Sequence, residues 1–238
     1  MTSPGGRAVE RVLVPLVIAV VALVAWDTPF VYPVKIFVVL LHELSHGLAA
    51  VMTGGAIERI ELSADQGGVC WTRGGWSFVV LSAGYLGSLV AGAALLVVAA
   101  RTRLDQAVAL GLGVVVLLVT ALWVRTGFGL VYGLAAGGAL VVIGWKLPAV
   151  VSDVVLRVIG VVSCLYVPWD IATDLVLRSH PDSDATQLGR MTGIPGIVWG
   201  VAWGAVAVVI AGVALRASVR AEPTLARAAG VPVIGSRI

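Results

Sequence analysis

Residues 38–48 of the chain are Val38-Val39-Leu40-Leu41-His42-Glu43-Leu44-Ser45-His46-Gly47-Leu48, so two histidines and a glutamate interrupt an otherwise apolar run. In a helix, residues four apart lie on the same face, and His42 and His46 can therefore direct imidazole nitrogens at one metal ion. Glu43 lies beside them, where a carboxylate can accept a proton from a metal-activated water. The H-E-x-x-H spacing thus predicts a zinc site equipped with a general base.

The composition of the chain is that of a membrane protein. Apolar residues make up 59% of it, charged residues only 12%, and the mean hydropathy is +1.03. Soluble domains carry about 25% charged residues. Ionisable side chains inside a bilayer are costly unless they face a cavity, one another or an ion, and we therefore expect the zinc motif to form a site within the membrane.

The distribution of the charged residues argues against nucleic acid as a partner. The net charge is +3, and the Lys and Arg residues are scattered through loops and chain ends. A nucleic-acid-binding protein would gather them in a basic patch interleaved with aromatic residues. We expect the lipid bilayer to be a partner and nucleic acid not to be one.

Long apolar segments predict an all-α integral membrane protein with six to seven transmembrane helices. The segments are Val12–Trp26, Val31–Thr53, Trp76–Ala100, Leu104–Val124, Phe128–Trp145, Pro148–Val167 and Gly196–Leu215. In the second segment, His42 lies ~16 Å from the start, near the middle of a bilayer. We expect residues 1–216 to form one multi-pass membrane domain and residues 217–238 to form a polar tail.

A short β-hairpin is predicted directly after the zinc-motif helix, which we expect to end at Gly54-Gly55. Apolar and polar residues alternate over 56–62, a Gly-rich turn follows, and residues 69–72 favour a second strand. An exposed hairpin edge can accept an extended peptide as an added strand, which makes Ile57, Ile60 and Leu62 candidate substrate contacts. The alternative is a plain surface connection.

The third metal ligand is not set by the motif. Catalytic zinc usually takes three protein ligands and keeps one open position, so a carboxylate is required. We expect Asp170, with Asp174 as the alternative, because both share a helical face beside apolar residues if the sixth helix continues past residue 168. Asp182 and Asp184 fall in a segment, Ser179–Thr192, that we expect to be a polar loop. The competing interpretation is that Asp170 and Asp174 only face water.

Three further features have structural explanations. Asp153 and Arg157 are four residues apart and are expected to pair with each other. Asp105 stands at a helix start, where a carboxylate complements the helix dipole. The small residues Gly84 and Gly87 predict close packing of the third helix against its neighbours.

The motif His42-Glu43-Leu44-Ser45-His46-Gly47 in a membrane helix resembles the site-2 protease group, peptidase family M50. Other stretches resemble the compact M50B-like bacterial branch of this family. They are Gly54-Gly55 with the hairpin, Ala83–Ser88, Trp169–Leu175, and Ser183-Asp184-Ala185 through Thr192-Gly193-Ile194-Pro195. The family supplies its third ligand from a Leu-Asp-Gly or Asn-Pro-Asp-Gly motif, neither of which occurs here; Leu104-Asp105-Gln106 is the nearest match.

The resemblance implies an intramembrane zinc endopeptidase in the bacterial plasma membrane, with one zinc ion per chain and transmembrane proteins as substrates. His42 and His46 would be ligands and Glu43 the catalytic base. A catalytically inactive membrane scaffold that binds or regulates transmembrane clients is the main alternative. The sequence does not predict an oligomeric state.

Overall fold

The computed structural model describes residues 4–173 and 183–219, and the side chains of residues 13–173 and 183–218. The helices and strands, in chain order, are α1 (Pro4–Val24), α2 (Tyr32–Met52), β1 (Ala56–Leu62), β2 (Gly68–Arg73), α3 (Ser77–Arg101), α4 (Asp105–Trp123), α5 (Gly127–Lys146), α6 (Ala149–Ala172), α7 (Asp184–Thr192) and α8 (Gly196–Val219). Among these described elements, six helices are long and apolar enough to cross a membrane: α2, α3, α4, α5, α6 and α8. The expected all-α membrane fold with a short hairpin is confirmed, and the chain is a multi-pass integral membrane protein.

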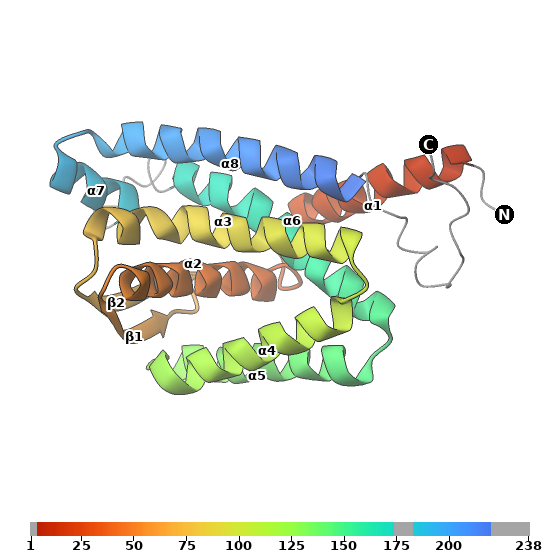
Figure 1. The fold of residues 1–238 in the computed structure, drawn as a ribbon, viewed down its shortest axis with the longest axis horizontal. Helices are drawn as coiled ribbons and strands as arrows, with labels where there is room; N and C mark the ends of the chain where they lie inside the picture. Colours follow the sequence, from red (N-terminus) through yellow and green to blue (C-terminus); the bar gives the residue numbers. More distant parts are fainter. Residues whose placement is uncertain (1–3, 174–182, 220–238) are drawn as a thin grey trace.

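The zinc-motif helix α2 is the most enclosed of the six spans, whereas α4, α5 and α8 turn most of their side chains outward. Figure 1 shows α3 lying between α2 and α8, with the α4–α5 pair on the opposite side of α2. Phe37, Val38 and Leu40 on α2 are almost completely buried in the main hydrophobic cluster. The polar motif therefore lies on the helix that lipid reaches least, as the cost of exposing ionisable groups to hydrocarbon requires.

The hairpin runs back along α2 instead of projecting away from it (Figure 1). β1 and β2 are antiparallel, with Ile60 opposite Cys70. Beyond the strands, the Tyr32 hydroxyl at the start of α2 donates a hydrogen bond of 2.6 Å to the carbonyl of Ala64 in the turn. Because α2 ends where β1 begins, this bond shows that the hairpin turn has returned to the first turn of α2.

The outer edge of β1 is not exposed, which corrects part of the sequence prediction. The turn between α4 and α5 covers it: the N–H of Arg125 donates to the Ile60 carbonyl over 3.0 Å. The Thr126 hydroxyl accepts from the Leu62 N–H over 3.1 Å and donates to the Leu62 carbonyl over 2.8 Å. The side chains of Ile60 and Leu62 are buried in the core, so these two candidate contacts present no side chain to a substrate. Ile57 packs against α2 at Gly47.

The end of α6 agrees with the sequence prediction, and the segment that follows it differs from the prediction. The helix does continue past Pro168, to Ala172. Within the segment expected to be a polar loop, Asp184–Thr192 form a short helix, α7. Residues 174–182, which include Asp174, lie outside the described residues.

The expected pair of Asp153 and Arg157 is confirmed within α6. Arg157 Nε lies 2.9 Å from Asp153 Oδ1, and both residues are only 4% exposed. The guanidinium also donates to the carbonyl of Ala99 over 3.2 Å, which connects α6 to the end of α3. Arg157 therefore joins α6 and α3 at this junction.

Candidate metal centre

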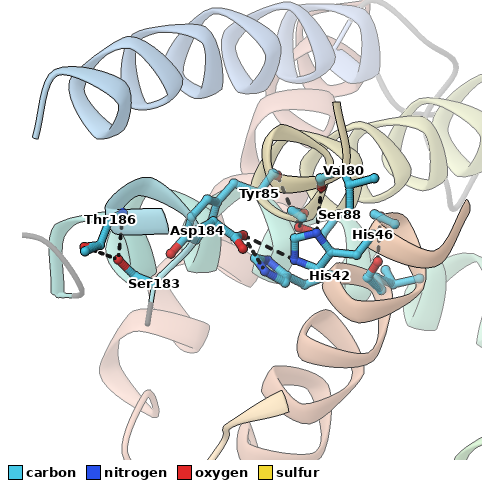
Figure 2. A network of polar contacts seen from close by, with 11 residues as sticks. His42, His46, Val80, Tyr85, Ser88, Ser183, Asp184 and Thr186 are labelled. Carbon is cyan, nitrogen blue, oxygen red and sulfur yellow. Dashed lines mark hydrogen bonds and ion pairs between the residues drawn. The ribbon is translucent and has the colours of Figure 1, made fainter. Parts of the chain in front are cut away.

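The two histidines of α2 point at one carboxylate oxygen (Figure 2). Nε2 of His42 lies 3.1 Å from Asp184 Oδ2, and Nε2 of His46 lies 3.3 Å from the same atom. The imidazole rings are edge to face, with centroids 4.8 Å apart. One helical turn thus brings two nitrogens to a common point, as the i, i+4 spacing predicts.

The orientation of His46 is fixed from behind by α3. Its Nδ1 lies 2.7 Å from the carbonyl oxygen of Val80. A carbonyl can only accept, so Nδ1 carries the proton and Nε2 is left with a free lone pair that faces Asp184. Metal-binding histidines commonly have such a second partner, which sets the tautomer and the ring plane.

Asp184 is held in place by the helix that it begins. The Ser183 hydroxyl caps α7 by accepting from the N–H of Thr186 over 3.3 Å, as drawn in Figure 2. Further along α7, Ala185 and Leu188 are fully buried in a cluster with Trp203 of α8. The serine cap and the apolar face together dock α7 with its first residue turned toward α2.

Tyr85 on α3 connects this cluster to the histidines. Its ring lies edge-on to His42, with centroids 4.9 Å apart, and contacts the ring of Trp203 at 5.5 Å. The aromatic contacts therefore run from α8 through α3 to a histidine of the motif.

The carboxylate of Asp184 lacks a hydrogen bond at the oxygen that faces the histidines. Although Oδ2 is close to both Nε2 atoms, it makes no hydrogen bond of acceptable geometry. A buried carboxylate oxygen without a hydrogen bond is expensive unless an ion satisfies it.

These three residues fit a zinc ion. Their ligand atoms all lie within 4.8 Å of one another, and no other group of three His, Cys, Asp or Glu residues in the described part of the chain converges in this way. Two imidazole nitrogens and one carboxylate oxygen are a usual donor set for catalytic zinc, which keeps its fourth position open.

Gly84 of α3 makes room for this centre. A Cβ atom placed on it would lie 2.5 Å from Nε2 of His46 and closer still to Nε2 of His42. One turn on, a Cβ on Gly87 would lie 2.5 Å from the Ser45 hydroxyl. The predicted close packing of α3 is therefore present, and one of its close contacts is at the metal centre.

Glu43 is buried on the neighbouring face of α2, against β2. Gly68 lies so close that a Cβ on it would be 2.6 Å from Glu43 Oε1. The main chain of Cys70 gives the Glu43 carboxylate a hydrogen bond. The expected base thus contacts the hairpin.

The structure brings Asp184, and not Asp170, to the two histidines. Asp170 lies near the end of α6 and is not a member of the His-His-Asp group; the alternative ligand Asp174 is outside the described residues. Asp105 is in the first turn of α4, as expected. The local sequence indicates only the start of α7: Ser183 is a favoured capping residue, and Ala185 and Leu188 follow at helical spacing.

Comparison with known proteins agrees with this geometry. The family model described as Peptidase M50B-like matches residues 15–214. The chain belongs to the M50B-like peptidase family. A search of curated proteins found no match, and neither did a search of solved structures. Membership of the M50B-like family suggests a membrane metallopeptidase of the site-2 protease type.

Proposed function

We propose that this M50B-like protein is an intramembrane zinc endopeptidase that hydrolyses peptide bonds of membrane-embedded proteins. The observation that supports this most is the convergence of His42, His46 and Asp184 on one point, directly beside Glu43, on the most enclosed membrane-spanning helix. Membership of the M50B-like family supports the same class of activity.

One zinc ion per chain would be held by the Nε2 atoms of both histidines and by the Asp184 carboxylate. When bound, zinc supplies a Lewis acid that polarises the scissile carbonyl and lowers the pKa of a water ligand to about 7. The backbone contact from Val80 keeps His46 in the tautomer that this requires.

Glu43 would be the general base. Its carboxylate accepts the proton of the attacking water and then passes it to the leaving amine, which must be protonated for the peptide bond to break. Glu43 neighbours His42 in sequence and is buried, so the proton is moved in a site shielded from bulk water.

The substrate would have to be extended at the cleaved bond, because the carbonyls of a transmembrane helix are already hydrogen-bonded. With the β1 edge covered by Arg125 and Thr126, the main chain of β2 is the part of the hairpin that faces Glu43. Main-chain pairing with β2 would bring an extended peptide to the metal centre.

Replacement of Glu43 by Gln tests this proposal. The purified wild type should cleave members of a quenched-fluorescent library of apolar peptides in detergent, whereas Glu43→Gln should retain zinc and lose turnover by at least about a hundredfold. Glu58→Gln, the same change on an exposed hairpin residue, is the matched control and should behave as the wild type.

The same experiment separates the alternative function. A scaffold that binds transmembrane clients without cleaving them would contain zinc, show no cleavage of any library member in the wild type, and not distinguish Glu43→Gln from wild type in client binding. This result would reject the endopeptidase.

A further inference from the structure

The connection between α1 and α2 forms a polar pocket that the proposed peptidase chemistry does not use. Its volume is about 260 Å³, and it is lined by Asp27, Thr28, Pro29, Tyr32, Lys35 and Gln66. Because α2 is long and apolar enough to cross a membrane, its first turn stands at one end of the span, where lipid headgroups lie. Trp26 contacts Trp169 here, with ring centroids 6.4 Å apart, and tryptophans gather at membrane interfaces.

Lys35 brings a buried ammonium group to this pocket. The residue is 5% exposed, and its Nζ lies 5.2 Å from the centroid of the Trp26 ring. The carboxylate that pairs with it, on Asp27, is 4.0 Å away and its side chain is 95% exposed. Within the described residues, no hydrogen bond satisfies the three donors of the ammonium group. A loose contact with a carboxylate in water compensates little of the cost of burying this charge.

The pocket therefore presents one charge of each sign, side by side. An anion attracted to Lys35 would be repelled by Asp27, and a cation attracted to Asp27 would be repelled by Lys35. A ligand that carries both a phosphate and an ammonium group satisfies both side chains at once. Charge complementarity thus favours a zwitterion over a simple ion.

The surroundings of the pocket are apolar. Val24 and Phe30, which flank the lining residues Asp27–Pro29 in the chain, are both exposed large hydrophobic residues. In an integral membrane protein such side chains contact acyl chains. The ligand that fits both the pocket and its rim is a lipid with a zwitterionic headgroup.

The turn of the hairpin supplies the remaining polar group. The hydrogen bond from the Tyr32 hydroxyl to the Ala64 carbonyl holds this turn against the first turn of α2 and brings Gln66 to the pocket. Gln66 has a φ of +69°, a left-handed conformation that is costly for a residue with a side chain. Such conformations cluster at ligand sites. The Gln66 amide offers both a donor and an acceptor there.

We infer that this pocket binds the headgroup of a phospholipid with a primary amine, its phosphate on Lys35 and its ammonium on Asp27. The Gln66 amide donates a further hydrogen bond to the phosphate, and the acyl chains lie against Val24 and Phe30. The bound lipid holds the hairpin turn to the start of the zinc-motif helix, because both line the pocket. The inference is independent of the proposed peptidase activity, since none of these residues belongs to the metal centre.

Native mass spectrometry of the delipidated full chain in detergent tests the site with three lipids of identical acyl chains. Phosphatidylethanolamine carries the phosphate and a primary amine, phosphatidylglycerol has no amine, and the quaternary ammonium of phosphatidylcholine has no N–H to donate. We expect the wild type to bind phosphatidylethanolamine about tenfold more tightly than either of the others. Equal affinity of the wild type for all three lipids would overturn the inference.

Lys35→Met removes the ammonium group and keeps an apolar stem of similar length. It should weaken phosphatidylethanolamine about tenfold, the effect of one charge-assisted hydrogen bond. Lys146→Met is the matched control, because Lys146 Nζ also lies over a tryptophan, 5.1 Å from the ring centroid of Trp145, but at the exposed end of α5. It should bind as the wild type does. Equal affinity of the two variants for phosphatidylethanolamine would refute the role of Lys35.

Asp27→Asn tests selectivity inside a single protein, so the result does not depend on how much of the variant folds. The change removes both the partner of the amine and the repulsion of an anion. The preference for phosphatidylethanolamine over phosphatidylglycerol should therefore fall from about tenfold to about one. A preference that survives in Asp27→Asn would contradict the assignment of the amine to this carboxylate.

Glycerophosphoethanolamine, which has the same headgroup and no acyl chains, distinguishes a lipid from a soluble phosphodiester. It should displace phosphatidylethanolamine only at concentrations at least about a hundredfold higher, because it lacks the apolar contacts. Displacement at equal concentration would show that the pocket takes the free headgroup and would overturn the assignment to a lipid.

Discussion

Oδ2 of Asp184 lies 3.1 Å from Nε2 of His42, although α2 and α7, which carry these residues, are separated in the chain by four long helices and the hairpin. The contact exists because α7 is docked between α3 and α8 with its first residue turned inward. His46 approaches the same oxygen, so the position of α7 decides whether α2 has a third ligand.

A methyl group on Gly84 should disrupt the metal centre. In Gly84→Ala the new Cβ would overlap the Nε2 atoms of both histidines, and the helices are held too closely for α3 to retreat. We expect a loss of at least about tenfold in zinc affinity, measured by competition with a chelator. Gly138→Ala adds the same methyl where nothing lies within 4 Å and should bind zinc as the wild type does. Zinc binding that is equal in both variants would contradict the arrangement of α2 and α3.

The cap of α7 should contribute to zinc affinity. Ser183→Ala removes the hydroxyl that accepts from the Thr186 N–H, and loss of such a cap costs about 1 kcal/mol. Because Asp184 is the next residue, we expect zinc affinity to fall about fivefold. Ser183→Thr keeps an accepting hydroxyl and should restore most of it. An unchanged affinity in Ser183→Ala would show that α7 is positioned by its apolar face alone.

The buried pair in α6 should show strong coupling between its members. Arg157→Leu leaves the Asp153 carboxylate buried without its cation, which costs about 3 kcal/mol or more, whereas Asp153→Leu combined with Arg157→Leu removes both charges. The midpoint temperature of thermal unfolding in detergent should therefore be lower in Arg157→Leu than in the double variant. Additive or larger loss in the double variant would contradict the prediction.

Most of the architecture was predictable because the lipid bilayer restricts which structures can cross it. The apolar segments had to be helices, and the motif had to lie on a helix shielded from lipid, as α2 is. The alternation over 56–62 and the Gly-rich turn likewise predicted the hairpin that the structure contains. The pair of Asp153 and Arg157 was predictable because residues four apart share one face of a helix.

The third ligand was not predictable from those rules. The sequence favours Asp170 because it shares a helical face with Asp174 beside apolar residues if the sixth helix continues past residue 168, and it assigns Asp184 to a polar loop. The decisive contacts are tertiary: Ala185 and Leu188 are buried only once α8 supplies Trp203. The cover on the β1 edge was also missed, since Arg125 and Thr126 have no local signal that they would bind Ile60 and Leu62.

The zinc content of three purified proteins tests the central claim most directly: the wild type, Asp184→Ala and Asp170→Ala. We predict one zinc ion per chain in the wild type and in Asp170→Ala, and a loss of tight zinc binding in Asp184→Ala, which leaves only His42 and His46 as ligands. Retention of zinc by Asp184→Ala, with loss in Asp170→Ala, would contradict the site described here.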